Sequence, residues 1–542
     1  MKKFAFLCHL TNHLTLEIMK KINLKYKSVS FLLFFGLFLT SCMDYLQEIN
    51  VDQKLITDEL LRHDANEGGV SLPGMQLGVV DVLTTWRFEM QQNLNADNYG
   101  GYMSLPSPFF DNRNTGTYVM VDSWNNQIWA VPSQKVLDQW VMMKKKNFDA
   151  LYPDLYSMGI IFKTFAGHRL ADVFGPIPYS RYGESSDVAF DSVEDSYDIF
   201  FKELKEAVDI LKAAEEENPT ADQIRYAKFD RSRFGGDYAI WVRVANTLRL
   251  RLAIRISKVD PVRAKMEAEA AVSDGVLMSG NGSFEMSTGT IHPLETITAA
   301  WQETRINAMV ETLLGGFNDP RINVFAVPAS DPALNGQIKG VRSGAIFGSQ
   351  PYIGYSQVNF FNNPYVKLMD VAESYFLRAE GALRGWNMGG SAKDFYEEGI
   401  RVSFNAYGVG GVDAYLENST GTQLPYVDVY NPVNNIAPTT DITIKWEEGD
   451  TFERKLERII TQKWIAIYPD GQEAWSEFRR TGYPKLYPIA VNYSEFSGGT
   501  FIKRITYPTS ITNSSQNAVS QAISEYLGGE DNIYTPLWWD VD

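Results

Sequence analysis

The residue with the clearest chemistry in this sequence is Cys42, which follows a short apolar segment. That segment, residues 29–39, is preceded by four lysines between positions 20 and 27. Its 11 residues are fewer than the roughly 20 that a membrane-spanning helix needs, so the pattern is typical of an export signal. Leu39 and Ser41 stand three residues and one residue before the cysteine, as in bacterial lipoprotein signals. We therefore expect cleavage before Cys42, a lipid on its thiol, and a position outside the cytoplasm at a membrane. An ordinary secretory signal with an incidental cysteine is the alternative.

The signal also sets the first domain boundaries. Met19 begins a Met-Lys-Lys sequence of normal signal layout, so the signal proper is predicted at 19–41 within a signal region 1–41. Residues 42–70 are polar and acidic with a Gly-Gly near their end, and we interpret them as a lipidated tether. Residues 71–542 are then expected to form a single domain.

Residues that could carry out catalysis are few or unremarkable. The sequence has no G-x-S-x-G, H-E-x-x-H, P-loop or EF-hand motif. After Met19 it has three widely spaced histidines, which predicts no zinc site and no histidine-based triad. Carboxylate pairs such as Glu397-Glu398 and Glu447-Glu448 are expected in any acidic chain. Glycoside hydrolysis needs two carboxyl groups about 5–10 Å apart across a sugar, which a sequence does not show. We expect these pairs to be solvated, and we predict no enzyme and no cofactor.

Charge and cysteine content limit the partners and the means of stabilisation. The chain has a formal net charge of −16, and loss of residues 1–41, which hold six Lys and one Glu, would make it −21. A protein this acidic is repelled by nucleic acid and by anionic membrane lipids. The lipid attached to Cys42, rather than a basic surface, must therefore hold it at a membrane. With Cys42 lipidated, no partner remains for a disulfide in the mature chain, and stability must come from a packed core.

The elements that must position any site are mainly helices. Apolar residues recur every three or four positions over 238–256, 368–383, 392–405, 456–468 and 473–479, and arginines occupy the remaining faces of the first segment, which predicts an amphipathic helix. Ser192 and Asp195 resemble a capping box that opens another helix through Leu211. We expect 368–383 to pair with 392–405 and 456–468 to pair with 473–479, as in helical repeats. Residues 281–365 and 408–450, rich in Gly, Asn, Ser and Pro, are predicted to be long loop-rich insertions.

Five segments, in this order along the chain, together resemble the SusD/RagB family of outer-membrane nutrient-binding lipoproteins. The Arg-Arg-Thr-Gly-Tyr-Pro ending of the last segment resembles the SusD-like branch most. The five are RLADVFGPIPYS at 169–180, FGGDYAIW at 234–241 with ANTLRLRLA at 245–253, AESYFLRAE at 372–380, YEEGIR at 396–401, and ITQKWIA at 460–466 with EAWSEFRRTGYP at 473–484. The motif residues themselves are expected to hold the fold, with Trp464 and Trp475 in the core.

This resemblance implies the rest of the interpretation. The fold would be mainly α, with a tetratricopeptide-like helix-pair scaffold and loop-rich insertions that form the ligand face. The lipoprotein would bind an oligosaccharide, or in some members a peptide, and deliver it to a SusC-like TonB-dependent transporter without catalysis. It would be anchored in the outer membrane by lipid, exposed at the cell surface, and would bind no nucleic acid. Some members hold a structural calcium ion, but no ligand loop here assigns one.

Sugar rings pack their flat C–H faces on aromatic side chains, and amides or charged groups then select the hydroxyl pattern. Suitable residues lie in two stretches, and for any one of them burial beneath a loop is the alternative. A Tyr102→Ala change is expected to weaken ligand binding and leave folding normal. The candidates are Asn98, Tyr99, Tyr102, Phe109, Phe110, Arg113 and Tyr118 in the first stretch, Trp301, Tyr352 and Tyr355 in the second, and Asn95 and Asn335 as further amides.

Two other classes of protein remain open from the sequence. A lipoprotein glycoside hydrolase would have a cleft with two close carboxyl groups. A helical-repeat adaptor would have an open concave surface without sugar-stacking aromatics. The missing catalytic motifs weigh against the first class, and the aromatic loops weigh against the second.

Overall fold

The computed structural model describes residues 66–217, 225–348 and 350–541, and residues Gly68–Asp542 form one compact unit. The predicted signal region and Cys42 lie outside the described residues. Of the predicted tether, residues 66–70 are described, and α4 (Asn66–Gly69) covers most of them. Within the described ranges no helix is long and apolar enough to cross a membrane.

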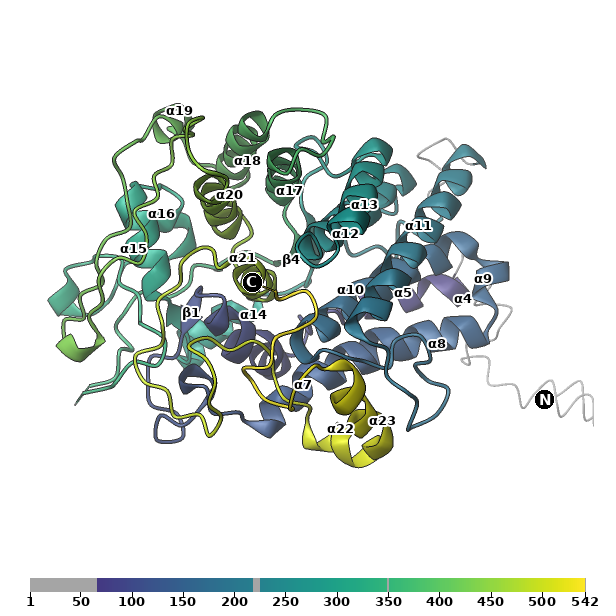
Figure 1. Ribbon diagram of the computed structural model, residues 1–542, viewed down its shortest axis with the longest axis horizontal. Coiled ribbons are helices and arrows are strands. Elements are labelled where there is room, and N and C mark those ends of the chain that lie inside the picture. The colour runs from purple at the N-terminus through teal and green to yellow at the C-terminus, as the bar shows by residue number, and fades with distance from the viewer. Residues whose placement is uncertain (1–65, 218–224, 349, 542) are drawn as a thin grey trace, which may run out of the picture. The chain divides into compact units, whose positions relative to one another are not determined.

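The scaffold consists of helices that pack in consecutive pairs, so the predicted mainly α, helix-pair fold is confirmed (Figure 1). Within each pair the two helices are neighbours in sequence, and successive pairs also contact each other through α11 and α12 and through α12 and α17. The pairs are α10 (Pro153–Phe174) with α11 (Val193–Glu217), α12 (Tyr238–Arg255) with α13 (Pro261–Asp274), and α17 (Val371–Leu383) with α18 (Ala392–Ala406).

Local sequence explains where these helices begin. The Ser192 hydroxyl accepts a hydrogen bond from the backbone N–H of Asp195 at 2.9 Å, so the predicted cap opens α11. Asp237 caps α12 and Asp370 caps α17 in the same way. Helix α10 ends at Phe174 because the next residue, Gly175, has a φ of 92°, which is readily adopted only by glycine.

Two details of the predicted helices are wrong. Residues 365–369 form strand β4 (Tyr365–Met369), which pairs antiparallel with β2 (Phe284–Ser287), so α17 begins at Val371. Helix α20 (Phe452–Ala466) packs mainly on α17 and α18, and α21 (Gly471–Thr481) packs mainly on a π-helix, η3 (Glu89–Asp97). The predicted pairing of these last two helices is therefore wrong, because α21 packs mainly on η3.

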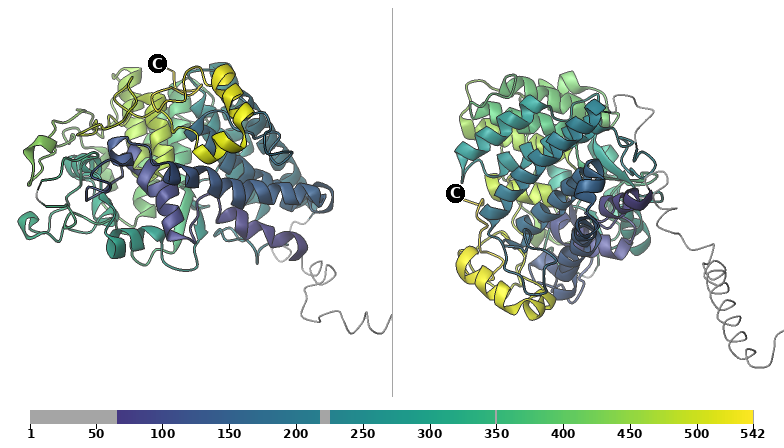
Figure 2. Two further views of the ribbon diagram at one scale, coloured as in Figure 1. Left: turned by 90° about the horizontal axis from the view of Figure 1, so that it is seen from below. Right: turned by 90° about the vertical axis from the view of Figure 1, so that its right-hand side faces the viewer.

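Loops and short elements gather at one end of the unit, opposite α8, α9 and α11 (Figures 1 and 2). The second small sheet joins β1 (Met103–Ser104) and β3 (Arg305–Ile306). The remaining elements are α5 (Ser71–Gln76), α6 (Thr85–Phe88), η4 (Thr115–Thr117), α7 (Asp122–Pro132), η5 (Ser133–Leu137), α8 (Asp138–Lys145), α9 (Phe148–Leu151), α14 (Pro293–Glu295), η7 (Thr296–Trp301), α15 (Ala308–Phe317), α16 (Ile322–Phe325), η8 (Pro332–Leu334), α19 (Val412–Leu416), η9 (Pro432–Asn434), α22 (Thr509–Ser514), α23 (Gln516–Gln521) and η10 (Ala522–Tyr526).

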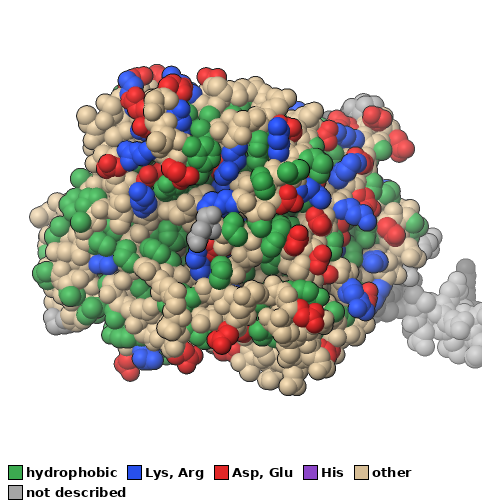
Figure 3. All heavy atoms as spheres, viewed as in Figure 1, with side chains coloured by type: hydrophobic (Ala, Val, Ile, Leu, Met, Phe, Trp, Pro, Cys, Tyr) green, Lys and Arg blue, Asp and Glu red, His purple; other side chains and the backbone are tan. Residues whose placement is uncertain are grey.

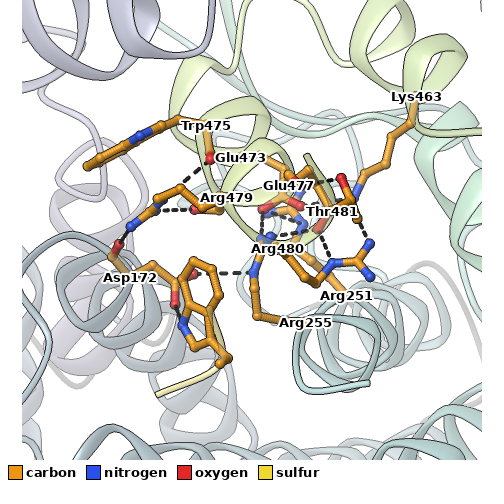
Figure 4. A network of polar contacts seen from close by, with 12 residues as sticks. Asp172, Arg251, Arg255, Lys463, Glu473, Trp475, Glu477, Arg479, Arg480 and Thr481 are labelled. Carbon is orange, nitrogen blue, oxygen red and sulfur yellow. Dashed lines mark hydrogen bonds and ion pairs between the residues drawn. The ribbon is translucent and has the colours of Figure 1, made fainter. Parts of the chain in front are cut away.

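A buried network of ion pairs lies where α10, α12, α17, α20 and α21 meet (Figure 4). Arg255 binds Glu473 and Glu477, each at 2.6 Å, and Arg480 binds Glu477 and Glu380 at 2.6–2.7 Å. The other members are Arg251 with Glu373 at 2.6 Å, Lys463 with Glu473 at 2.9 Å, and Asp172 at 3.7 Å from Arg255. We call these nine residues the buried ion-pair network.

This network corrects the prediction that α12 is amphipathic. Arg249, Arg251 and Arg255 are buried, so α12 has no solvated arginine face on these turns. The pattern misled because arginine is usually exposed, whereas here each guanidinium has a carboxylate on a neighbouring helix.

Replacing Arg480 with Ala should lower the free energy of unfolding by about 3–5 kcal/mol, because Glu380 and Glu477 would be left in the core with a partner missing. Urea denaturation followed by circular dichroism measures the change. Lys205→Ala is the matched control, since its pair with Asp209 is exposed and should contribute less than about 0.5 kcal/mol. Equal, small losses in both variants would contradict the structural role of the network.

Candidate ligand-binding site

The structure divides the predicted site residues into a buried group and an exposed group. Among the buried ones, Tyr102 is 0% exposed. Its ring packs at a tilt against the Trp464 ring, with 4.7 Å between the ring centroids, and its hydroxyl donates to the Trp464 carbonyl oxygen. The Tyr99 ring packs on the rings of Trp475 and Tyr118, with 5.2 and 6.0 Å between the ring centroids. Trp464 and Trp475 lie in the core, as predicted.

Tyr352 and Tyr355 form a second buried group beneath the loops. Their rings stack at 4.7 Å, and Tyr430 extends the stack at 6.1 Å from Tyr352. The Tyr355 hydroxyl donates to Asp428 at 3.2 Å. A sugar can stack only on a ring face that solvent reaches, so this burial argues against direct ligand contact. Burial argues in the same way against ligand contact by the rings of Tyr99, Tyr102 and Tyr118. It also keeps the amides of Asn95 and Asn98 away from a ligand.

The exposed predicted residues lie on three separate loops. Phe110, with 63% of its surface exposed, contacts Trp124 at 5.7 Å, and the Arg113 guanidinium lies 5.8 Å from the Tyr493 ring. Phe110, Asp111 and Asn112 have consecutive φ angles of 51°, 53° and 62°, an uncommon conformation for residues with side chains. Phe109 beside them is half-buried, and Asn335 is exposed on another turn. The structure thus keeps Phe110 and Arg113 accessible.

Trp301 is 39% exposed and ends the π-helix η7. Gln302 after it has a φ of 62°, and the buried Arg305 holds the loop in place by donating to the carbonyls of Thr298 and Ile353 at 3.0 and 2.9 Å. π-Helices are rare and often occur at functional sites. The Trp301 ring is therefore presented by a firmly held loop.

A second exposed tryptophan, Trp86, was missed by the sequence analysis. It is 44% exposed on α6, and the Arg87 guanidinium lies 5.1 Å from its ring. The candidates named from the sequence begin at Asn95, so Trp86 was not among them. An isolated tryptophan before a polar segment gave no signal that it would be exposed, because tryptophan is usually buried on average.

The segments that carry the two tryptophans are joined by polar contacts. Glu89 follows Trp86 by three residues, Glu303 follows Trp301 by two, and their carboxyl groups are hydrogen-bonded. Asn93 also donates to Thr304 at 3.4 Å. We call Trp86, Glu89, Trp301 and Glu303 the tryptophan site.

The Glu89 carboxyl group is neutral at physiological pH. Burial, its hydrogen bond with Glu303 and repulsion from that carboxylate together raise its pKa to about 9. Direct contact between the two groups also differs from a glycosidase arrangement, in which about 5–10 Å separates the carboxyl groups to admit the sugar and water. This pair is suited to hold two loops together, and of the two carboxyl groups only that of Glu303 lies on a half-buried residue; Glu89 is buried.

A cavity of about 620 Å³ has Phe88 and Gln92 in its wall, from α6 and η3, the elements that carry Trp86 and Glu89. That volume is within the range of small-ligand pockets. Aromatic rings line much of it, and His292 among them is neutral, because burial lowers its pKa to about 3. At its base Arg169 binds Asp470 at 3.1 Å and Gln92 at 2.9 Å. The aromatic lining is Phe88, His292, Phe325, Phe360, Tyr365, Tyr407 and Tyr468, and amides come from Gln92, Asn359, Asn363 and Asn405.

With this geometry described, comparison with known proteins identifies the family. The sequence model of "SusD-like: Susd and RagB outer membrane lipoprotein" matches residues 48–540. The chain belongs to this family of outer-membrane lipoproteins. Comparison with curated proteins finds no match.

Solved structures agree over most of the chain. A chitin-binding SusD homologue from Flavobacterium johnsoniae is 39% identical with a TM-score of 0.84, over 88% of this chain and 99% of that one. A SusD-like protein from Bacteroides thetaiotaomicron VPI-5482 is 32% identical with a TM-score of 0.82, and a SusD homologue from Bacteroides vulgatus ATCC 8482 is 32% identical with a TM-score of 0.81. In both comparisons the aligned region covers 88% of this chain and 99% of the matched chain.

No group of three or more His, Cys, Asp or Glu side chains suited to a metal occurs among the described residues.

Replacing Tyr102 with Ala should lower the free energy of unfolding by about 3–5 kcal/mol, in contrast to the normal folding expected from the sequence. The change would leave a cavity against Trp464 and Tyr468 and remove a hydrogen bond to a backbone carbonyl. Thermal and urea denaturation measure it. Phe110→Ala is the control, since that ring is exposed; a similar loss in both would contradict this assignment.

Replacing Glu89 with Gln should raise stability between pH 4.5 and about 9. Because its pKa is raised on folding, the folded protein binds more protons than the unfolded chain in this window, and wild-type stability falls as pH rises through it. Gln imitates the neutral carboxyl group and removes that fall. Urea midpoints at a series of pH values test this, with the exposed Glu216→Gln as control. Parallel pH profiles for wild type and Glu89→Gln would contradict it.

Proposed function

We propose that this protein is a cell-surface lipoprotein, anchored in the outer membrane through Cys42, that binds an oligosaccharide and delivers it to a SusC-like TonB-dependent transporter. Binding is the whole of its activity, without catalysis. The observation that carries the proposal is the 39% identity to a chitin-binding SusD homologue over nearly the whole of that chain. It favours oligosaccharide over peptide and makes chitin-type sugars, built of N-acetylglucosamine, the first ligands to test.

The tryptophan site has the chemistry that such a ligand needs. Trp86 and Trp301 are the exposed tryptophans among the large apolar side chains that the structure describes. A β-linked pyranose offers flat C–H faces to such rings, and each stacked ring contributes about 0.5–1.5 kcal/mol beyond its buried area. The half-buried Glu303 supplies hydrogen-bonding oxygens two residues after Trp301, and Glu89 holds its segment in place from below. The neighbouring 620 Å³ cavity supplies further aromatic rings and amides.

Replacing Trp301 or Trp86 with Ala should weaken binding of chitohexaose about tenfold while leaving stability nearly unchanged, because each ring is partly exposed. Isothermal titration calorimetry on residues 43–542 measures the affinity. Phe452→Ala is the matched control, with the same exposed fraction of 39% on α20.

The same samples should contain intact chitohexaose after prolonged incubation. Released shorter sugars would move the protein to the glycoside hydrolases. Binding that survives both tryptophan changes would place the ligand in the cavity or on the Phe110 loop. No binding of any sugar, with binding of peptides in a parallel screen, would overturn the oligosaccharide assignment.

A further inference from the structure

A second cavity, distinct from the tryptophan site and from the 620 Å³ cavity, lies at the C-terminal end of α21. Its volume is about 610 Å³, and loops 485–488, 498–503 and 534–541 complete its walls. Phe501 and Tyr534 are half-buried and give it an aromatic side, and the Phe501 ring packs on Phe478 at 4.8 Å. None of these residues belongs to the site proposed above.

The charge of this cavity is opposite to that of the chain as a whole. The full sequence carries a net charge of −16, yet the described lining holds five basic side chains and a single carboxylate, that of Asp540. Arg480 is compensated within the buried ion-pair network. The other four cations are Lys258, Arg479, Lys485 and Lys503. In Figure 3 basic side chains lie near the centre of this face, beside the C-terminal end marked in Figure 1.

Of these four cations, only Lys503 has a carboxylate of the described residues within hydrogen-bond distance, that of Asp540. The other three have distant or uncharged partners. Arg479 is buried and donates to the carbonyls of Asp172 and Lys503 at 2.6 and 2.7 Å. Lys485 is 3.9 Å from Glu457, beyond hydrogen-bond distance, and about half of its side chain is exposed. Lys258 is exposed and donates to the Val541 carbonyl at 3.2 Å. A positive potential is therefore left unbalanced in the cavity, where low-dielectric walls strengthen it.

Asp540 shows what kind of group the cavity accepts. Lys503 binds its carboxylate at 2.8 Å, and the Asp540 side chain is 3% exposed. The second carboxylate oxygen, Oδ2, is buried and has no hydrogen-bond partner within the described chain. A buried acceptor without a donor is unfavourable, so this oxygen is positioned for a donor from a ligand. The cavity thus combines free cations with one unsatisfied acceptor and an aromatic side.

We propose that this cavity is a second binding site, for a sugar unit that carries a carboxylate, such as a hexuronate. The carboxylate lies against Lys258, Lys485 and the Arg479 guanidinium behind them. A ring hydroxyl donates to the free Asp540 oxygen, and the C–H face of the sugar packs on Phe501 and Tyr534. This assignment is independent of the proposed function of the tryptophan site. It lets one protein bind an acidic sugar unit as well as a neutral one.

Isothermal titration calorimetry with tetragalacturonate, at low and at high salt, tests the proposal on residues 43–542. Wild type should bind, and binding should weaken as ionic strength rises. The double variant Lys258→Gln/Lys485→Gln should bind about tenfold more weakly, since each exposed charge pair contributes up to about fivefold. Lys205→Gln, an exposed lysine on α11, is the matched control.

Each result decides the question. Undetectable binding by wild type, or equal affinity in the double variant and the Lys205→Gln control, overturns the proposal. Complete displacement by sulfate at the same charge concentration overturns the sugar part of it, because the cavity would then recognise charge alone. The lysines are exposed, so the double variant is expected to fold, and its melting temperature checks this. The double variant should still bind chitohexaose with unchanged affinity. That result would show that the lysines act on the second cavity and not on the tryptophan site.

Discussion

The buried ion-pair network is the constraint on which the rest of the structure depends. Charges taken out of water lose several kcal/mol of hydration each, and only well-placed partners offset that loss. Burial opposes ionisation of Glu473, but Arg255, Lys463 and Arg251 outweigh it and lower its pKa to about 2. Because the partners come from five helices, the charges are satisfied only when all five lie at their native positions. Hydrophobic packing alone would tolerate small shifts that this network does not.

Helix α21 links the buried ion-pair network to the tryptophan site through a series of hydrogen bonds and an ion pair. Asp470 caps α21 and binds Arg169, which in turn holds Gln92 of the π-helix η3. The Asp97 carboxylate of η3 accepts from the N–H of Gly471 at 3.2 Å. Glu89 begins the same π-helix and Trp86 precedes it. The position of one exposed tryptophan is thus fixed from the core outward, and the Glu89–Glu303 contact ties the other to it.

The sequence predicted the scaffold well, because helical periodicity and caps are local signals. The pairing of α17 with α18 and the Ser192 cap were predicted from neighbouring segments and are confirmed, whereas the predicted pairing of α20 with α21 was wrong. The site was harder to predict, since exposure of an aromatic residue depends on what packs over it from distant segments. Tyr102 and Trp301 look alike in sequence, yet one meets Trp464, 362 residues away, and the other is left on a turn. The arginines of α12 were misjudged for the same reason, because their partners lie on other helices.

The distribution of charge follows the same logic. The acidic residues in excess give the net charge of −16, and their number alone predicts only what the protein repels. Several arginines are instead buried. On α21, Arg480 binds carboxylates of the network, whereas Arg479 donates to the backbone carbonyls of Asp172 and Lys503. Arg479 lies between the Trp475 and Trp539 rings, 3.7 and 4.8 Å from their centroids, and bonds to carbonyls. Its charge is therefore held in place without being neutralised by a contacting carboxylate. One helix turn thus supplies a cation that is paired with carboxylates and a cation that neutral groups hold in the wall of the adjoining cavity.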